Sequence, residues 1–559
     1  MRSTTNKILF AVLILGTIMR FWGLATPDVI NDEALIGFRS IGLIDYLASP
    51  SQPTTWERLD PIPAWAHLTN HDHPQVVFWL QHWSMKLFGV GTFGLRLPSA
   101  LFGLLSVFLL YLIGKKLFDT KVGLLTAALA AFNIYFVWVS KIGLQEAILL
   151  GLILSAVYFG IGYQEQKYNL YLAFVFAGLA VMAKYTGIAA LILILVWFWL
   201  TERKIYRTKK PYLGLVLFFL IVSPILIYNI ALYQTIGHFD LQFSFLFGQS
   251  PAEWQNLPGK EQIGGLGQRL ADFGRNVFAN GSYIFAVVAA TSLIYSILHF
   301  KNAQAKKPIV FLYSAMVLNF SLLMIIGARE RFLVMLYPYL CLLVAVTVLT
   351  VYEKYSKTRT RVLSIALLAT FLGFEALYSF NTTIATYPQG SSPWTYSALE
   401  ADNRPWGYDQ LDEYLNQELK GSYPEFQLPL RQKFLEDIKA KTILKAKDEG
   451  KASRKLMIIY DENIHNNAAL WYVLRRVVYE GWPIIPAQTY LELTGSDPEF
   501  FKKSGFAETW FIKATDNTLL EHQRSPYPQS LEDGLTNLVM PIDIVKAPNG
   551  ETAFKIYKF

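Results

Sequence analysis

Apolar stretches long enough to cross a membrane recur along the chain up to residue 381, and they restrict its possible folds more than any other feature. A helix needs about 20 mostly apolar residues to cross a hydrocarbon layer of about 30 Å. Two of the stretches, 122–138 and 169–183, are short and are expected to be tilted or broken. The predicted spans are eleven: residues 7–24, 95–114, 122–138, 143–161, 169–183, 185–200, 211–233, 278–299, 308–327, 332–351 and 362–381. The fold class is therefore a polytopic α-helical membrane protein.

The composition of the chain agrees with this class. Apolar residues make up 53% of the 559 residues and charged residues only 16%, whereas a soluble protein has about 25% charged residues. Disordered, coiled-coil and nucleic-acid-binding proteins are therefore poor matches, and no nucleic-acid partner is expected. The single cysteine, Cys341, excludes an internal disulfide framework.

The distribution of lysine and arginine predicts the orientation, because cytoplasmic connections are rich in both residues. With a cytoplasmic N-terminus, the cytoplasmic segments hold 18 Lys and Arg in 49 residues, whereas the two long outer loops, 25–94 and 234–277, hold six in 114. The net charge of +8 is thus mainly a topology signal. An odd number of spans places the C-terminus outside. The chain ends in KIYKF without a retention signal, so we expect the plasma (cell inner) membrane rather than the endoplasmic reticulum.

The chain is predicted to contain a membrane domain followed by a soluble one. Residues 1–381 form the membrane domain, and residues 382–408, rich in Pro, Ser and Gly around 387–397, form a linker. Residues 409–559 are expected to form an extracytoplasmic α/β domain, since they are numerous enough for a separate core. Three of its elements are predicted from their patterns: strands at 455–460 and 508–514 and a helix at 466–480.

The first outer loop carries the densest group of polar residues. Asp32 and Glu33 directly follow the first span, and amphipathic helices are predicted at 33–48 and 75–89, both lying in the membrane interface. An acidic pair at a helix start is usually explained by the helix dipole. Isolated charges also occur in the short outer connections: Lys141, Glu146, Lys184, Arg329 and Arg331.

Each of these single charges can be explained by a long side chain that reaches the membrane interface. Several of them beside an acidic loop on one face favour a functional interpretation. A carboxylate base near several cations is what group transfer from an anionic phosphate requires. Charges within the spans are scarce, Arg20 and Glu375 being the main cases, and this argues against an ion-coupled transporter.

The histidines of the first outer loop allow two interpretations. His67, His71 and His73 have a spacing that metal ligands can adopt. The group contains no cysteine and no matching acidic partner, so hydrogen bonding or phosphate contact is favoured over zinc. No cofactor is required by the sequence, and a divalent metal is left as an open alternative.

Several motifs, taken together, resemble those of a known superfamily. An Asp-Glu pair follows the first span at 32–33, and His73-Pro74 precedes an interfacial helix. Phe88-Gly89-Val90, Arg96-Leu97-Pro98-Ser99 and the segment 140–147 follow in the same order. The chain thus resembles the C-type glycosyltransferases (GT-C), specifically the dolichyl-phosphate-mannose–protein mannosyltransferase and bacterial aminoarabinose-transferase superfamily. The similarity is close over about residues 7–200 and is one of layout over 201–381.

The resemblance implies roles for single residues. Asp32 takes the place of the family's outer-loop carboxylate, expected to be the base that removes the acceptor proton. Glu33 follows it, and because adjacent helical positions diverge by about 100°, Glu33 is expected to orient the cation at Lys141 instead. The family usually has Arg at the position of Lys141 and Asp at that of Glu146, so this chain departs from the pattern at both. Lysine lacks the bidentate fork of arginine.

Two further positions match. His73 corresponds to the His-Pro motif of the protein-mannosyltransferase branch, and Arg331 corresponds to an arginine at the outer end of a late span, where a donor-phosphate contact is expected.

The resulting hypothesis is a membrane glycosyltransferase with an inverting mechanism. It would move a sugar from a polyprenyl-phosphate donor to an acceptor protein, lipid or glycan outside the cytoplasm, with the lipid tail of the donor in an apolar groove among the spans. Three alternatives stay open: a ligase or oligosaccharyltransferase-like enzyme that uses a diphosphate-linked glycan, a lipid or polysaccharide transporter, and a non-catalytic membrane scaffold.

Overall fold

The computed structural model describes residues 2–45, 54–166, 168–251, 264–300, 305–355, 358–536 and 540–559. Contacts within the chain divide it into two compact units. The first, which we call the helical unit, comprises Met1–Leu24, Ser51–Thr55 and Thr69–Asn403. The second, the sheet unit, comprises Ala25–Pro50, Trp56–Leu68 and Arg404–Phe559.

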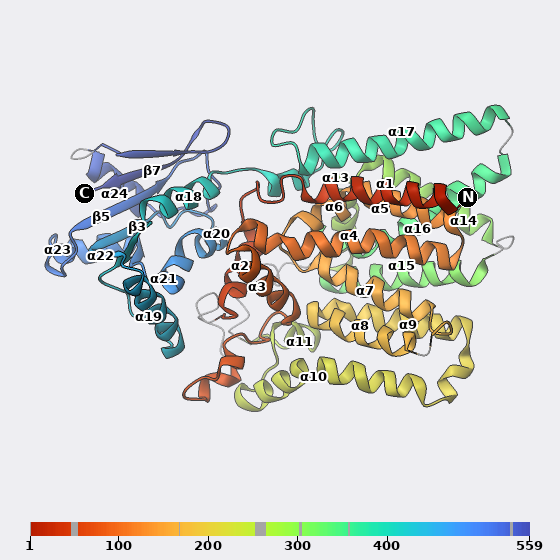
Figure 1. The fold of residues 1–559 in the computed structure, drawn as a ribbon, viewed down its shortest axis with the longest axis horizontal. Helices are drawn as coiled ribbons and strands as arrows, with labels where there is room; N and C mark the ends of the chain where they lie inside the picture. Colours follow the sequence, from red (N-terminus) through yellow and green to blue (C-terminus); the bar gives the residue numbers. More distant parts are fainter. Residues whose placement is uncertain are drawn as a thin grey trace. The chain divides into compact units, whose positions relative to one another are not determined.

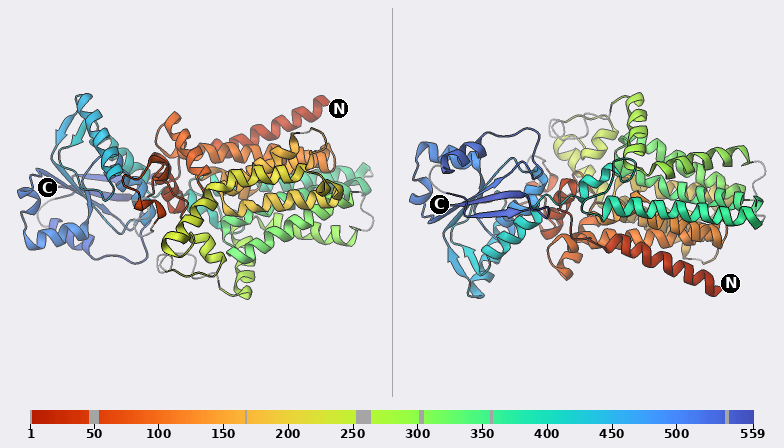
Figure 2. Two further views of the ribbon diagram at one scale, coloured as in Figure 1. Left: turned by 90° about the horizontal axis from the view of Figure 1, so that it is seen from below. Right: turned by 90° about the horizontal axis from the view of Figure 1, so that it is seen from above.

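Helices that run side by side make up most of the helical unit (Figure 1, Figure 2). The principal ones are α1 (Arg2–Phe21), α3 (Val76–Phe88), α4 (Thr92–Leu117), α5 (Thr120–Phe132), α6 (Ile134–Lys141), α7 (Glu146–Ile161), α8 (Asn169–Ala183), α9 (Ile188–Thr201), α10 (Lys210–Ile236), α11 (Leu241–Leu246), α13 (Leu266–Asn280), α14 (Tyr283–Leu298), α15 (Lys306–Ile326), α16 (Tyr337–Tyr355) and α17 (Thr358–Thr383). Each predicted span lies on one or two of these helices, so the polytopic helical class is confirmed.

The number of spans depends on how the shorter helices are counted. Among the described residues, six helices are long and apolar enough to cross a membrane: α1, α4, α10, α15, α16 and α17. The pair α5 and α6 would make a seventh, although the two helices are bent by 56°. Four shorter apolar helices, α7, α8, α9 and α14, coincide with the remaining predicted spans. The count of eleven stays a prediction.

The bend between α5 and α6 has a local cause. Asn133 separates the two helices in an extended conformation, and its side chain accepts a hydrogen bond of 3.1 Å from the Tyr135 amide. This side chain caps α6 and satisfies one of its free amides. The predicted span 122–138 is therefore broken, as its short length suggested, whereas 169–183 is one continuous helix, α8.

The sheet unit is built on a five-stranded sheet of order β4-β3-β5-β7-β6. Its strands are β3 (Leu456–Tyr460), β4 (Ile484–Pro486), β5 (Glu508–Ala514), β6 (Asp543–Lys546) and β7 (Thr552–Lys558). Strands β4, β3 and β5 are parallel, and β7 is antiparallel to β5 and β6. A separate parallel pair joins β1 (Ser422–Pro424) to β2 (Ala452–Arg454). The strands predicted at 455–460 and 508–514 are confirmed as β3 and β5.

Helices flank this sheet. They are α2 (Asn31–Gly42), α18 (Tyr408–Glu418), α19 (Lys433–Asp448), α20 (Asn466–Ala469), α21 (Arg475–Tyr479), α22 (Ala487–Ser496), α23 (Phe500–Lys503) and α24 (Tyr527–Thr536). A π-helical turn, Leu470–Leu474, joins α20 to α21. The helix predicted at 466–480 thus exists, with one wider turn in its middle.

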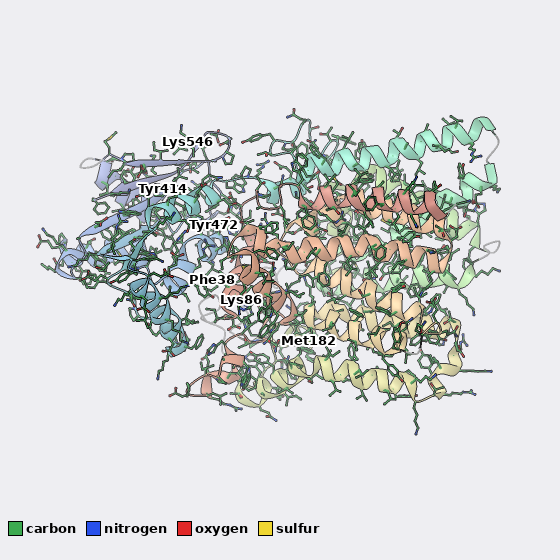
Figure 3. The ribbon with its side chains drawn as sticks, in the orientation of Figure 1. Phe38, Lys86, Met182, Tyr414, Tyr472 and Lys546 are labelled. Carbon is green, nitrogen blue, oxygen red and sulfur yellow. The ribbon has the colours of Figure 1, made fainter. Side chains whose placement is uncertain are left out.

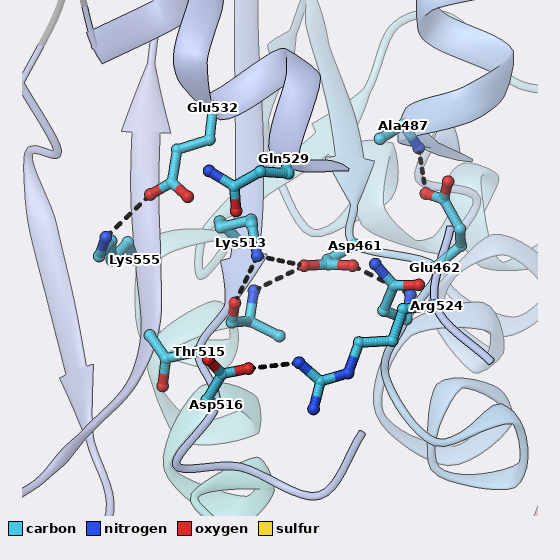
Figure 4. Close-up of polar contacts among 12 residues, drawn as sticks. Asp461, Glu462, Ala487, Lys513, Thr515, Asp516, Arg524, Gln529, Glu532 and Lys555 are labelled. Atoms are coloured by element: carbon cyan, nitrogen blue, oxygen red, sulfur yellow. Dashed lines mark hydrogen bonds and ion pairs between the residues drawn. The ribbon is translucent and has the colours of Figure 1, made fainter. Parts of the chain in front are cut away.

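Polar contacts fix the carboxyl ends of the parallel strands (Figure 4). Asp461, just after β3, is 3.0 Å from the Lys513 ammonium of β5 and accepts a hydrogen bond of 3.2 Å from the Ala514 amide. The neighbouring Glu462 accepts from the Ala487 amide at 3.0 Å, at the start of α22. These carboxylates are paired within the cluster, so the contacts hold β3, β5 and α22 in place.

The first outer loop does not lie as a whole in the membrane domain, where the sequence placed it. Part of it, including α2, belongs to the sheet unit. The amphipathic helix predicted at 33–48 is confirmed as α2. Its apolar side, which was expected to lie in the membrane interface, is covered instead by residues of the sheet unit. Phe38 and Ile44 pack with Leu435, Leu470 and Val478 in one cluster. An amphipathic pattern shows which side of a helix is buried, not what buries it.

Candidate active site

Three of the charged residues from the outer connections meet in the helical unit. Glu146 begins α7, and its side chain is 2% exposed. The Lys184 Nζ atom lies 2.5 Å from Glu146 Oε1, and Arg331 Nε lies 3.9 Å from the same oxygen. We call these three residues the charged group. One carboxylate thus lies close to two cations in the charged group.

The surroundings of the charged group leave it able to accept an anion. Both cations lie against Phe332, whose ring centroid is 4.4 Å from Lys184 Nζ and 5.2 Å from the Arg331 guanidinium carbon. In a buried setting of this kind, charge-assisted contacts to a phosphate are strong. Lys184 and Arg331 are cations of the kind that suit an anionic guest or leaving group.

The loop before Glu146 is held by two polar side chains that the sequence did not single out. Gln81 of α3 is fully buried and donates a hydrogen bond of 2.7 Å from Nε2 to the Gly143 carbonyl. Ser99 of α4 donates to the Leu144 carbonyl at 3.3 Å. In the sequence, Gln81 stands out only as a polar residue within an apolar helix pattern. Ser99 lies in the Arg-Leu-Pro-Ser motif. Both residues position the start of α7.

A second buried acid, Asp240, lies beside the residue that follows Lys184. Asp240 Oδ2 accepts hydrogen bonds from the Tyr185 hydroxyl at 2.5 Å and from Asn229 Nδ2 at 3.0 Å. Its other oxygen accepts from the Phe243 amide at 2.8 Å and so caps α11. Burial raises the pKa of the Asp240 carboxyl. Sequence reasoning missed this residue, which is an isolated acid at a helix start.

The His71–His73 segment is tied to the same loop. The His71 carbonyl accepts from the Leu241 amide at 2.9 Å, and the Asp72 carbonyl accepts from Gln242 Nε2 at 3.3 Å. Asp72 itself lies between the two imidazoles, 3.3 Å from His71 Nε2 and 2.9 Å from His73 Nδ1. His73, which is predicted to contact the donor phosphate, therefore lies in a group of polar residues that Asp72 connects.

The three histidines considered as metal ligands do not form a ligand group. His67 belongs to the sheet unit, where its ring stacks on Phe434 with 3.7 Å between centroids and its Nε2 lies 3.1 Å from the Ile62 carbonyl. Among the described residues, no three His, Cys, Asp or Glu side chains are arranged to hold a metal ion. The metal interpretation of His67, His71 and His73 stays an open alternative.

Lys141 and Arg329 take other positions. The Lys141 ammonium donates to the Trp22 carbonyl at the end of α1, and Arg96 donates to the Leu24 carbonyl at 3.1 Å. Lys141 therefore satisfies the carboxyl end of α1, a role that a cation suits. Arg329 is exposed and directly precedes the 3₁₀ turn Glu330–Met335, which carries Arg331.

Asp32 and Glu33 lie in the first turn of α2, in the sheet unit. Asp32 is half-buried and Glu33 is 4% exposed. The preceding Asn31 has a φ of 53°, a left-handed conformation that Asn tolerates better than most residues. The two acids thus differ in exposure, as expected for adjacent positions of one helix.

An apolar groove begins at the 3₁₀ turn that supplies Arg331. Its volume is about 580 Å³, within the range of about 300–1,000 Å³ typical of ligand sites. Leu333 and Leu336 contribute to it directly after Arg331 and Phe332. The other walls come from α13, α14, α15 and α16, with lining residues Phe273, Val277, Phe285, Ala286, Ala289, Ala290, Leu293, Ile297, Tyr313, Met316, Val317, Phe320, Tyr337 and Leu340.

Comparison with known proteins finds a family model that matches part of the chain and solved structures with a similar fold. The family model described as dolichyl-phosphate-mannose-protein mannosyltransferase matches residues 72–228, which include Glu146 and Lys184. The crystal structure of ArnT from Cupriavidus metallidurans in the apo state has a TM-score of 0.55 at 12% identity, over 100% of this chain and 98% of that one. The chain therefore shares the fold of that ArnT structure, and residues 72–228 are similar to the mannosyltransferase family.

Other solved GT-C structures are similar along most of the chain. ArnT from Cupriavidus metallidurans bound to undecaprenyl phosphate has a TM-score of 0.51 at 12% identity, over 100% of this chain and 97% of that one. The Archaeoglobus fulgidus oligosaccharyltransferase in complex with Zn and sulfate has a TM-score of 0.50 at 14% identity, over 98% of this chain and 72% of that one. At these identities the similarity concerns the GT-C fold. No match was found among curated proteins.

Proposed function

We propose that this GT-C protein transfers a sugar from a polyprenyl-phosphate carrier to an acceptor hydroxyl or amine. The observation that carries the proposal is the 3₁₀ turn Glu330–Met335, which supplies Arg331 to the charged group and Leu333 to the lining of the apolar groove. A polyprenyl phosphate has the matching chemistry, an anionic head on a long apolar chain. An ArnT structure of similar fold is described as bound to undecaprenyl phosphate.

In the proposed reaction, Asp32 removes the proton from the acceptor group. The acceptor atom forms a bond to the anomeric carbon as the bond from that carbon to the phosphate oxygen breaks, and the configuration inverts. The electron pair leaves with the polyprenyl phosphate, whose negative charge Lys184 and Arg331 stabilise. Glu146 holds both cations in position for the leaving group.

The acceptor side and the cellular side of the reaction are also part of the proposal. The charge asymmetry between the connections supports transfer on the extracytoplasmic face of a plasma membrane. The acceptor is a protein, lipid or glycan. We also propose that residues 382–408 form a linker and residues 409–559 a domain. Part of the loop 25–94 belongs to the same unit as residues 409–559.

Purified protein with radiolabelled polyprenyl-phosphate sugars tests the donor assignment. Lys184→Gln and Arg331→Gln should each reduce label release or transfer at least 10-fold. Lys121→Gln is the matched control, because Lys121 is exposed and pairs with exposed Glu353. Equal activity of all three variants would contradict the donor site. Competition by a diphosphate-linked oligosaccharide carrier, and not by the monosaccharide carrier, would instead favour the ligase alternative.

A further inference from the structure

The segment that leads into α2 is bound to the C-terminal part of the chain. Asp28 is buried, and its Oδ2 accepts hydrogen bonds from the amides of Trp406 at 2.5 Å, Gly407 at 3.0 Å and Tyr408 at 3.3 Å. Its Oδ1 accepts from the Asp409 amide at 2.8 Å. A carboxylate is favoured at the first turn of a helix, here α18. One side chain therefore joins residues that lie 378 to 381 positions apart in the sequence.

A buried tyrosine makes a second link to the same segment. The Tyr472 hydroxyl accepts a hydrogen bond of 2.6 Å from the Val29 amide and donates one of 2.7 Å to Asp409 Oδ1. Asp409 is the residue whose amide binds Asp28, so the two links share one partner. Figure 3 labels Tyr472 and Phe38, which both belong to the sheet unit.

Apolar contacts continue these links along α2. The helix packs against α20 and the π-helical turn Leu470–Leu474. The rings of Phe38 and Tyr479 have centroids 5.9 Å apart. At the end of α2, a Cβ added to Gly42 would lie 2.7 Å from the Tyr479 hydroxyl oxygen, which leaves no room for a larger residue. Helix α2 thus packs along its length against residues 404–559.

The charge of Asp32 also acts on this part of the chain. His465, directly before α20, is close enough to Asp32 for the carboxylate to act on it. Burial lowers the pKa of His465, and the charges of Glu521 and Asp32 oppose this shift. His465 Nδ1 is buried without a hydrogen-bond partner among the described residues. The charged and titratable groups around His465 are thus Glu521, Asp32 and, through its hydroxyl, Tyr408.

From these contacts we infer that the C-terminal part of the chain sets the position of the base, with Asp28 and Tyr472 as positioning residues for Asp32. This inference rests on the proposed function for the role of Asp32. The C-terminal part is the support on which the Asp32 helix folds, whereas the charged group is held by other elements.

Tyr472→Phe tests the inference in the full chain, because it keeps the ring and removes both hydrogen bonds. Tyr414→Phe is the matched control, since the Tyr414 hydroxyl also bonds one carboxylate in the sheet unit, Asp543 at 2.7 Å. Hydrogen exchange should become at least 10-fold faster at the amides of residues 29–34 in Tyr472→Phe and should not change there in Tyr414→Phe. The kcat for transfer should fall about 10-fold, with an unchanged KM for the polyprenyl-phosphate donor.

Two further variants make the result decisive. Gly42→Ala should produce the same split between kcat and KM, because it displaces α2 from Tyr479. Unchanged exchange at 29–34 in Tyr472→Phe, or faster exchange without a fall in kcat, would overturn the inference. A third outcome separates the two proposals: exchange and kcat respond as expected, but Asp32→Asn is fully active. In that case the support of α2 by the C-terminal part holds, and the proposed role of Asp32 as base is wrong.

Discussion

The carboxylate of Glu146 lies 2.5 Å from the ammonium of Lys184, a residue 38 positions later in the chain. The pair is buried, because the side chain of Glu146 is 2% exposed and that of Lys184 is 13% exposed. Removing such a pair from water costs desolvation energy, which the attraction between the two charges offsets. Together with Arg331, it is the part of the helical unit best suited to an anionic leaving group.

Removal of one member of this pair should be far more harmful than removal of both. Lys184→Met leaves a buried carboxylate with only Arg331, at 3.9 Å, and should destabilise the protein by about 3–5 kcal/mol. The double change Glu146→Gln with Lys184→Met should recover most of that stability but no transfer activity. Thermal unfolding in detergent measures the first effect and label transfer the second. Additive losses of stability would show that the pair is not coupled.

The sequence predicted the helices and the charged group better than it predicted the environment of Asp32. Hydrophobic length located the apolar helices, since a lipid environment demands them, and the count of eleven spans stays a prediction. Glu146, Lys184 and Arg331 were singled out because a charge at the end of a span is conspicuous. Gln81 was not singled out, because it forms a hydrogen bond to a backbone carbonyl, and no sequence pattern reveals such a bond.

The position of α2 could not be predicted from its pattern. An apolar face on α2 fits a membrane surface as well as it fits a folded domain, and only the tertiary contacts of Phe38 with Leu435 and Val478 decide between them. The Asp28 contacts with residues 406–409 join sequence positions too distant for any local signal.

Gln81 should control activity through the loop before Glu146. Gln81→Leu removes the hydrogen bond to the Gly143 carbonyl and leaves that carbonyl buried without its donor, at a cost of about 1–3 kcal/mol. We expect kcat for transfer to fall about 10-fold as Glu146 loses its position. Gln81→Glu, which retains the size but cannot donate when ionised, should be no better. Wild-type kinetics in both variants would show that Gln81 does not contribute to the site.

The apolar groove should determine the preference for the lipid chain of the donor. Ala289→Phe fills the groove from α14 and should raise the KM for a long-chain donor at least 10-fold, with little effect on a donor of one or two isoprene units. Val287→Phe is the control on the same helix, because Val287 is 58% exposed and does not line the groove. The same loss for both chain lengths would contradict a lipid-tail site.

The stability of the sheet unit should increase with pH around His67. Burial lowers the pKa of His67, opposed by its contact with the Ile62 carbonyl and by the charge of Asp45. The unfolded chain then binds a proton more readily than the folded one, so acidification through about pH 6.5 favours unfolding. His67→Phe keeps the stacking on Phe434 and should flatten this dependence between about pH 5 and 7. Chemical denaturation across that range measures it, and an unchanged slope would show that His67 does not contribute.

The central claim is that Asp32 is the base of a polyprenyl-phosphate-dependent glycosyl transfer, and Asp32→Asn tests it most directly. Wild type and variant would be compared with a panel of radiolabelled polyprenyl-phosphate sugars, with binding of the carrier measured in parallel. We predict that the variant binds the carrier with wild-type affinity and loses transfer by at least 10³-fold, within the range that general-base catalysis contributes, about 10²–10⁴-fold. Transfer at the wild-type rate by Asp32→Asn would contradict the claim.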